Sequence, residues 1–491
     1  MTTHLIRPAD HSADAGHHRP PATAGLGLAA LTALVVGSMI GSGIFALPSQ
    51  MASSAAPGPL VVGWMITGVG MLMLAFVFQN LVARKPEIDG SVYGYARAGF
   101  GDYIGMTSAW GYWVSAWVGN VGYLVLLAST LGYFWPSFEG GNTVSAIVLA
   151  SVVLWLVHVT ALRGVHNAAF VNTVVTIAKV VPILTFIAIA AVGFKAGIFT
   201  ADIWGKSAGL GTTLDQVKNM MLVTVWVFIG IEGASVYSQR ASRRSDVGKA
   251  TLMGFFGVLA LLLAVNLLAY GLMAQARIAG LSDPSMAALM KHEVGSWGAG
   301  FISAGLTISL LGALLAWVLL CVEILRLPAR DHVLPSALGH ENTHGAPDVA
   351  LWVTNGCVQL MLLWTLYNDG TYTKLIYLAT SLILLPYLWS AAYQVLLAVR
   401  GETYDGGHGR VKDLVVGAVA LGYGVWLVYA GGWQYVLVAG LFYLIGTGFF
   451  VWARHESRQV WFTAVEKVLV GLVGLLSVAA VVGLFQGWVS V

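Results

Sequence analysis

Three ionisable side chains lie well inside long apolar runs of the sequence, where a charge is costly unless it is paired, protonated or in contact with water. They are Lys179, Glu232 and Glu323. Lys179 lies in the middle of its run, too far from a helix end for its amine to reach the interface by snorkelling. Lys179 is therefore a candidate proton carrier. The alternative is a structural charge that pairs with carbonyl groups of the first apolar run.

The two carboxylates have competing interpretations. Glu232 is either a cap that accepts backbone N–H groups of an interrupted helix, or a proton-sensitive group that couples substrate binding to gate movement. These roles overlap, because a carboxylate that holds the interruption would transmit its charge state to it. Glu323 could attract a cationic substrate, or it could pair with Arg326 three positions further along the same helix.

Two apolar runs are interrupted by glycine at equivalent places. The first contains Gly37, Gly41 and Gly43 in VVGSMIGSGIF, and the sixth contains Gly230 and Gly233 in WVFIGIEGASV. Glycine is costly in a helix interior and permits unwinding. Interruptions five helices apart predict two inverted five-helix repeats, with the substrate site at the interruptions near the bilayer midplane. Close helix packing through the GxxxG of Gly37 and Gly41 is the alternative for the first.

Long apolar runs follow a polar N-terminal stretch, which predicts an all-α membrane protein. We expect thirteen transmembrane helices, with twelve as the alternative count because the limits of the last three are indistinct. Residues 1–25 are expected to form a disordered cytoplasmic tail, 26–399 a ten-helix transport core, and 400–491 accessory helices that give a scaffold or a homodimer face. The predicted helices span 26–53, 58–83, 104–134, 143–162, 170–194, 219–240, 250–276, 296–325, 348–366, 374–399, 412–430, 433–453 and 468–488.

The basic residues predict the side that each loop faces, since loops rich in Lys and Arg stay in the cytoplasm. With the N-terminus inside, eighteen of the 25 Lys and Arg residues fall in inner segments, and only Lys179 falls within a span. A multi-pass cell-membrane protein with a cytoplasmic N-terminus is therefore expected. The six basic residues in outer loops are Lys195, Lys206, Lys218, Arg277, Lys291 and Lys374.

Other classes of function find little support in the sequence. A net charge of +3 over 491 residues provides no basic face for a nucleic acid. Residues 340–344 spell HExxH, but this zinc-binding pattern needs a helix, and here it lies in a loop between glycines. Cys321 and Cys357 lie in apolar runs and offer neither a disulfide framework nor a metal site. With no nucleophile beside a base, we expect no enzymatic activity, no metal and no cofactor.

Five segments together are similar to a known family. They resemble the basic amino acid/polyamine antiporters of the amino acid–polyamine–organocation superfamily over residues 26–488, and the arginine/ornithine subgroup most closely. The resemblance implies a transporter that exchanges cationic amino acids, arginine for ornithine first of all, by alternating access. A proton-coupled amino acid importer, or an exchanger of lysine, histidine or polyamine, is the alternative. The segments are GSMIGSGIFALP, KPEIDGSVYGYARAGFGDYIG, SAWGYWVSAWVGN, WVFIGIEGASVYSQRASRRSDVGKAT and LIYLATSLILLPYLWSAAYQV.

The resemblance assigns substrate-binding groups to both interruptions. The Ser42 hydroxyl and the Gly43 amide would hold the substrate carboxylate, while carbonyls of Met39, Trp226 and Ile229 would hold the α-amine. The ends of unwound half-helices suit this chemistry, because free N–H groups favour an anion and free carbonyls favour an ammonium group.

The third and eighth spans would supply a pocket for the substrate side chain. The carbonyl oxygen of Asn120 can accept a hydrogen bond from a cationic head group. Trp317 matches the tryptophan on which family members stack a guanidinium by cation–π attraction, although a Trp in an apolar helix is more often packing. The segment YWVSAWVGN also places Tyr112, Ser115 and Ala116 toward the site.

Four side chains are assigned coupling or gating roles: Lys179, Glu232, Tyr112 and Glu323. For Lys179, the resemblance implies that the amine fills the place where some proteins with this fold bind sodium. Trp226 would act as a gate aromatic as well as a binding residue, with simple packing as the alternative.

Overall fold

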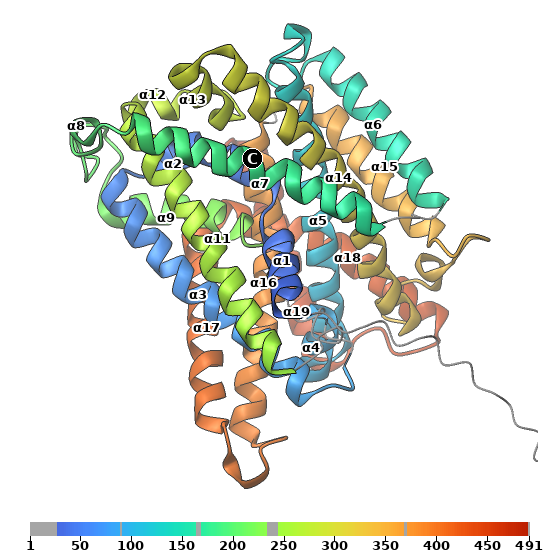
Figure 1. The fold of residues 1–491 in the computed structure, drawn as a ribbon. Coiled ribbons are helices and arrows are strands. Elements are labelled where there is room, and N and C mark those ends of the chain that lie inside the picture. The colour runs from blue at the N-terminus through green and yellow to red at the C-terminus, as the bar shows by residue number, and fades with distance from the viewer. Residues whose placement is uncertain (1–26, 89–90, 164–167, 233–243, 368–370, 490–491) are drawn as a thin grey trace, which may run out of the picture.

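The chain folds into an all-helical bundle in the computed structural model, which describes residues 27–88, 91–163, 168–232, 244–367 and 371–489 (Figure 1). Within these residues, ten helices are long and apolar enough to cross a membrane. Helices dominate because a membrane provides no water for unpaired backbone N–H and C=O groups. The ten are α3 (Pro57–Arg84), α5 (Asp102–Leu131), α6 (Val144–Leu162), α7 (Ala168–Gly193), α11 (Arg244–Leu272), α14 (Ser296–Arg330), α16 (Tyr372–Arg400), α17 (Arg410–Gly431), α18 (Trp433–Glu456) and α19 (Ala464–Gln486).

The first, sixth and ninth predicted spans contain shorter elements. The first is divided into α1 (Leu28–Met39), a 3-10 turn η1 (Ser42–Phe45) and α2 (Leu47–Ser54). The sixth contains α9 (Thr213–Trp226), which gives way to turns over 227–232. The ninth is α15 (Asp348–Thr365). Both predicted interruptions are thus present, and every predicted span overlaps a helix.

The limits of two predictions change in the structure. The sixth span begins at Thr213 rather than at 219, because the Thr212 side chain and Asp215 form a capping box that starts the helix in a polar segment. Within the described residues the last three spans are separate helices, α17, α18 and α19. The total of thirteen transmembrane helices stays a prediction. The predicted tail, 1–25, lies outside the described residues.

Short helices cover the two ends of the bundle at equivalent points of the two halves. The second membrane helix, α3, leads into α4 (Val92–Phe100), whose start is capped by the Ser91 hydroxyl. The seventh, α11, leads into α12 (Gln275–Ala279) and α13 (Ser285–Val294). Figure 1 shows α4 at one end of the molecule and α12 and α13 at the other, as an inverted repeat requires. We call these ends the α4 side and the α13 side.

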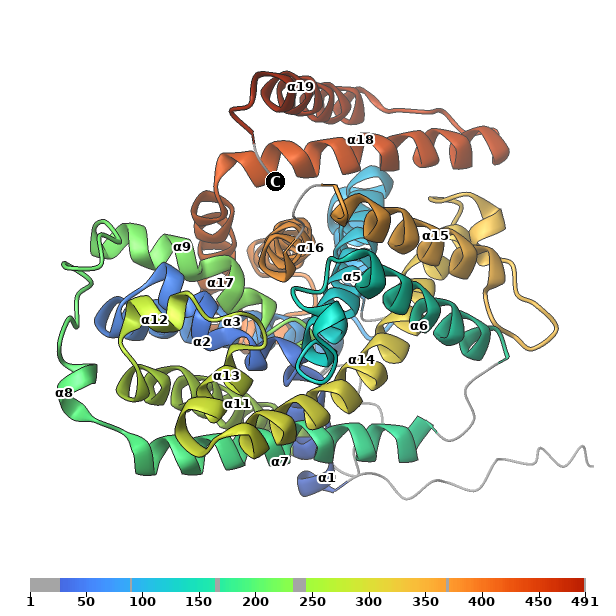
Figure 2. The ribbon, with the colours of Figure 1, turned by 90° about the horizontal axis from the view of Figure 1, so that it is seen from above.

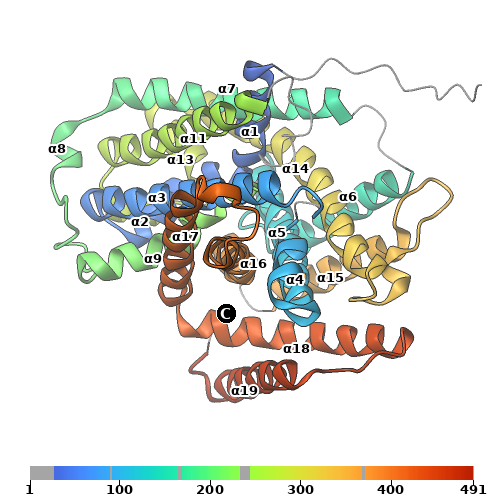
Figure 3. The ribbon, with the colours of Figure 1, turned by 90° about the horizontal axis from the view of Figure 1, so that it is seen from below.

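Helices α5 and α16 form the centre of the bundle (Figures 2 and 3). Helix α5 packs against six helices: α16, α14, α4, α6, α15 and α18. In its most apolar stretch of 18 residues, 89% is buried. Helices α18 and α19 line one edge of the bundle, opposite α7. Only 17% of the apolar stretch of α19 is buried. Helix α17 packs against α3, α9 and α16, so it is joined closely to the first ten spans.

Candidate functional site

The first break lies between α1 and η1, where the chain becomes extended at two residues. Ile40 has ψ 95° and Gly41 has φ −87° and ψ −179°. The Met39 carbonyl accepts a hydrogen bond from the Gly41 amide at 3.0 Å, so part of its capacity is already used. Ser42 is fully buried, and its hydroxyl lies beside those of Tyr123 and Tyr372 without a well-aligned hydrogen bond to a described group. A buried, unpaired hydroxyl is costly, which suits a ligand that would satisfy it.

Lys179 on α7 reaches this break with its amine. Nζ donates to the carbonyl of Gly37 at 2.6 Å and to that of Ile40 at 2.8 Å, and the side chain is buried. These carbonyls lie at the C-terminal end of α1, where the helix dipole favours a positive charge. The geometry fits both interpretations of Lys179, because structural pairing and cation replacement use the same contacts.

Glu232 lies at the second break and connects three parts of the site. Its Oε1 accepts from the Tyr112 hydroxyl on α5 at 2.5 Å, and its Oε2 accepts from the Tyr387 hydroxyl on α16 at 2.7 Å. Oε2 also accepts from the Gly230 amide at 3.1 Å. Gly230 has φ +105°, a conformation that only glycine adopts readily. Glu232 therefore links the second break to α5 and α16. Gly233 lies outside the described residues.

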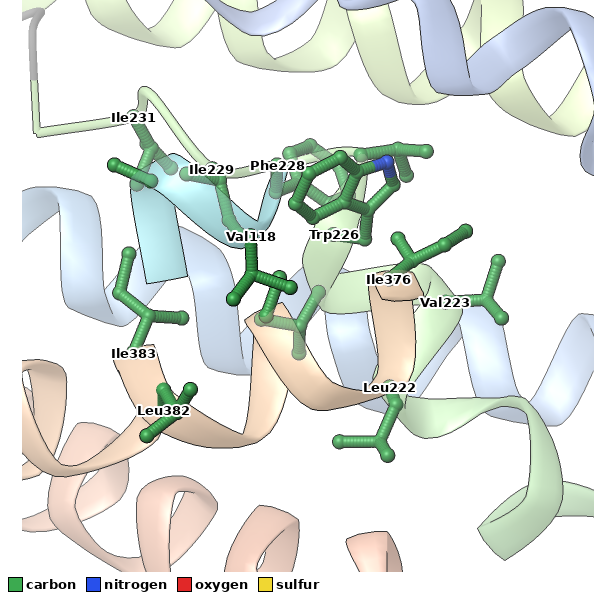
Figure 4. Packing of buried hydrophobic residues seen from close by; sticks show 14 of the residues in the cluster. Val118, Leu222, Val223, Trp226, Phe228, Ile229, Ile231, Ile376, Leu382 and Ile383 are labelled. Carbon is green, nitrogen blue, oxygen red and sulfur yellow. The ribbon is translucent and has the colours of Figure 1, made fainter. Parts of the chain in front are cut away.

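Trp226 lies between the two breaks and the central helices. Its indole occupies the space that a side chain at Gly43 or at Gly119 would need, since a Cβ at either position would lie 2.9 Å from the ring. Its Nε1 donates to the Tyr372 hydroxyl at 3.3 Å, and Tyr123 lies with its ring centre 6.0 Å away. Figure 4 shows Trp226 and Ile229 packed among residues of α5 and α16. The Trp226 carbonyl accepts from the Ile229 amide at 3.2 Å.

The predicted side-chain pocket lies between α5 and α14. Ser115, Ala116 and Asn120 are buried on α5. The Asn120 Nδ2 group donates to the Cys321 sulfur on α14 at 3.7 Å, while Oδ1 has no hydrogen-bond partner among the described residues. Trp317 is half-buried one turn before Cys321 on α14. An unpaired carbonyl oxygen can accept a hydrogen bond from a cationic head group, and an indole can stack on one.

Glu323 is not brought to this pocket. It lies exposed on α14 and pairs with Arg326 at 3.4 Å. Arg326 also bridges to Glu341 at 2.5 Å. The HExxH residues lie in a loop, where the His340 ring contacts Asp348 at 2.7 Å, and the described residues contain no group of three metal ligands.

A charged network lies on the α4 side, beside a cleft of about 450 Å³. The Arg97 guanidinium on α4 contacts Asp102 on α5 at 2.7 Å and also contacts Asp331, which follows α14. The Tyr93 hydroxyl donates to Asp331 at 2.8 Å, and Arg454 on α18 bridges to Asp102 at 2.7 Å. Ion pairs thus connect α4, α5, α14 and α18 at this end.

Hydrogen bonds hold α2 on the α13 side. The Tyr270 hydroxyl donates to the Ala55 carbonyl at 2.5 Å, and Gln275 Nε2 donates to the Ala52 carbonyl at 3.0 Å. The Ser49 hydroxyl donates to Asp283 Oδ1 at 3.0 Å. Burial raises the pKa of the Asp283 carboxyl to about 7. The second half of the first span is therefore fixed to α11, α12 and the segment before α13.

The sequence matches the model of the amino acid permease family over residues 26–475, which includes both breaks and the pocket. The chain belongs to that family. Within it, the permease is 57% identical to an arginine/ornithine antiporter of Pseudomonas aeruginosa, over 95% of this chain and 98% of that protein.

Two further relatives carry different names. An L-lysine transport protein of Corynebacterium glutamicum is 43% identical over 94% of this chain and 95% of its own length. An arginine/agmatine antiporter of Chlamydia caviae is 36% identical over 93% of this chain and 96% of its own length. The expected family membership is therefore confirmed, and the similarity covers at least 93% of this chain in each of these three relatives.

Three contributors to the permease site were absent from the sequence-based prediction. Tyr387 and Tyr372 on α16 contact Glu232 and Trp226, and Cys321 on α14 contacts Asn120. Tyrosines in an apolar span pack like other aromatics unless a polar partner is known, so their spacing alone gave no signal. A search for hydroxyl groups in the late run that could face Glu232 would have found Tyr387.

Proposed function

We propose that this permease exchanges arginine for ornithine across the cell membrane by alternating access. The observation that carries the proposal is the 57% identity, over nearly the whole of both chains, to a protein named arginine/ornithine antiporter. The relatives are named as transporters, and no enzymatic activity is proposed here. The buried hydroxyl of Ser42 and the buried oxygen of Asn120, both unpaired among the described groups, are suited to opposite ends of a cationic amino acid.

The α-amino acid part of the substrate would bind at the two breaks. Its carboxylate would take the Ser42 hydroxyl and the Gly43 amide at the start of the outer half-helix, where the dipole favours an anion. Its α-amine would take carbonyls of Met39, Trp226 and Ile229. Both arginine and ornithine carry this group, so one set of contacts serves both substrates.

The side chain of the substrate would extend between α5 and α14. Its cationic end would donate to Asn120 Oδ1 and lie over Trp317, with Ser115 and Ala116 lining the pocket. Trp226 would close the site toward the α13 side, together with Tyr372 and Tyr123. The hydrogen bonds of Glu232 to Tyr112 and Tyr387 would transmit the occupancy of the substrate site to α5 and α16. The exposed Glu323 has no role in this proposal.

The α4 side would face the cytoplasm, and so would the N-terminus. The distribution of basic residues supports this orientation, with eighteen in inner segments and six in outer loops. The Arg97 network would then close the inner face of the permease. Residues 412–488, which include the exposed α19, would give the scaffold or a homodimer face.

Lysine is the second candidate substrate. The relative named as an L-lysine transport protein supports it, and lysine is one methylene longer than ornithine. A hydrophobic pocket distinguishes a single methylene by only about 10- to 200-fold. Competition between lysine, ornithine and labelled arginine therefore belongs in the transport assay.

The test is transport by the purified full chain in proteoliposomes. Vesicles loaded with ornithine should take up labelled arginine at a rate insensitive to membrane potential, because both substrates carry one positive charge. Vesicles without internal substrate should take up little, because an exchanger requires the loaded form to cross. Comparable uptake into empty vesicles, driven by an inward proton gradient, would replace exchange with proton-coupled import.

A pocket variant tests the substrate contacts in the same assay. Trp317→Leu should weaken arginine about 30-fold if a desolvated cation–π contact of about 2 kcal/mol is lost. A short neutral amino acid that binds only at the breaks should be affected much less. Equal loss for both substrates would show that Trp317 supports the helix rather than the substrate.

A further inference from the structure

The Asn120 amide is buried between two helices with one end bound and the other free. Asn120 and Cys321 are both 0% exposed. Nδ2 of Asn120 donates to Sγ of Cys321 at 3.7 Å, while Oδ1 has no partner within the described residues. Buried polar atoms are nearly always hydrogen-bonded, so an unpaired acceptor here is a position that a donor should fill.

The two ends of the amide have opposite chemistry, so its orientation decides which ligands the pocket accepts. The NH2 end has donors only and would oppose a cationic group, whereas the carbonyl end accepts from one. A sulfur atom can accept a hydrogen bond from the NH2 end. In the structure the NH2 end faces Cys321, which leaves Oδ1 as the free end.

We propose that Cys321 is a positioning residue for charge selectivity, which holds the Asn120 amide so that its oxygen meets the cationic group of the substrate. The inference rests on the proposed function, since it takes a cationic amino acid as the ligand of this pocket. Trp317 lies one turn earlier on α14 and at the right spacing to share a face with Cys321. One face of α14 would then provide both the stacking surface and the group that orients the acceptor.

Two substitutions at position 321 separate this role from simple packing. Cys321→Ala removes the acceptor, which frees the amide to turn, while Cys321→Ser keeps an acceptor of similar size. Arginine and citrulline are matched ligands, since both have the same chain length but citrulline ends in a neutral urea group. The ratio of their inhibition constants against labelled arginine is the main readout in ornithine-loaded vesicles.

Cys321→Ala should lower the preference for arginine over citrulline about tenfold, as expected for one hydrogen bond to a charged group. The change should appear in the KM for arginine and leave the maximal rate nearly unchanged. Cys321→Ser should keep the preference within about threefold of the wild type, because its hydroxyl replaces the lost acceptor. Asn120→Ala should match Cys321→Ala, and the double variant should lose no more than either one.

Cys357→Ser is the matched control, because this half-buried thiol lies on α15 and away from the pocket. It should change neither inhibition constant. In the Cys357→Ser background, Cys321 is the one remaining thiol of the sequence. Arginine should slow its reaction with a small methanethiosulfonate reagent more than citrulline does.

Several results would overturn the assignment. Equal weakening of arginine and citrulline by Cys321→Ala would mean that the thiol only fills space. If Cys321→Ser lowers the preference for arginine as much as Cys321→Ala does, the hydrogen bond to Asn120 does not cause that preference. Thermal stabilisation of the detergent-solubilised chain by arginine and citrulline measures binding without transport. It therefore tests the role of Cys321 separately from exchange. If transport fails but arginine still stabilises the wild type more than Cys321→Ala, the exchange proposal is wrong and the role of Cys321 stands. No preference for arginine in the wild type would overturn both.

Discussion

The two breaks of the bundle each contain a side chain of opposite charge, and they use it differently. At the first break, Lys179 comes from another helix and binds two backbone carbonyls at the end of α1. At the second, Glu232 lies in the break itself and binds one backbone amide and two tyrosine hydroxyls. The positive charge of Lys179 is the one that the C-terminal end of α1 favours.

This difference separates a fixed contact from one that can change. The partners of Lys179 are backbone groups of a single segment, so the amine joins α7 to α1 as long as α1 keeps its end. Two partners of Glu232 are side chains, on α5 and α16, which can change rotamer when those helices move. The first break is therefore expected to be a rigid joint and the second a joint that responds to occupancy.

Replacement of Lys179 should have the largest effect. Lys179→Ala would leave the carbonyls of Gly37 and Ile40 without their charged donor, and hydrogen bonds of this kind contribute about 1.5–3 kcal/mol each. We expect exchange in proteoliposomes to fall about 100-fold or more, in a protein that still inserts. Lys195→Ala, which removes an exposed lysine near the end of α7, is the matched control. Wild-type exchange at all pH values would make Lys179 dispensable to the cycle.

The tyrosine partners of Glu232 should matter less than Lys179. Tyr387→Phe and Tyr112→Phe each remove one of three described hydrogen bonds to the carboxylate. Each should slow exchange about tenfold with little change in arginine affinity. The double variant should lose less than the two single losses combined, because both hydroxyls act through one carboxylate. Tyr435→Phe, at a tyrosine whose ring contacts Tyr377, is the control. If the double variant loses as much activity as the two single losses combined, the two tyrosines do not act through one carboxylate.

The charge of Glu232 can be separated from its shape. Glu232→Gln keeps an oxygen that can accept and removes the proton-binding group. We expect arginine binding to change by less than about threefold, since the hydrogen-bonded shape remains. The pH dependence of exchange should be weaker than that of the wild type, because the ionisable group is gone. Glu139→Gln, at an exposed position of the α13 side, should keep the wild-type profile. The same profile in Glu232→Gln would leave this residue as a structural cap only.

The sequence predicted the bundle well because its signals are local. Apolar runs of membrane length and glycines at two equivalent places indicated the helices and both breaks. The side chains that face Glu232 and Asn120 are long-range pairs, such as Tyr387 with Glu232 and Cys321 with Asn120. Helical position alone does not specify such pairs. For Glu323 the sequence left two roles open, attraction of a cationic substrate or pairing with Arg326. The structure contains the pairing with Arg326.

Helix α2, in the second half of the first span, offers the smallest and most specific test of rigidity at the first break. Asp283 accepts from Ser49 on α2, and its pKa of about 7 lies above the usual value near 4 because the carboxyl is buried. The folded chain therefore binds this proton more tightly than the unfolded chain. As the pH rises from about 4 to 7, Asp283 should lower stability, and the cost is fully present above pH 7.

Asp283→Asn removes that titration and keeps an oxygen for the Ser49 hydroxyl. The variant should melt a few degrees above the wild type at pH 8, and the difference should vanish near pH 4, because a stabilisation of 1 kcal/mol shifts the midpoint by roughly 2–4 °C. Asp215→Asn is the control, since it removes the capping box at the start of α9 and should lower the melting temperature by the same amount at every pH between about 5 and 8. Thermal unfolding in detergent across this range measures both. A gain in melting temperature that is the same at every pH would show that the Asp283 charge carries no cost and that the hydrogen bond alone holds α2. The first break would then be rigid at every pH at which the permease works.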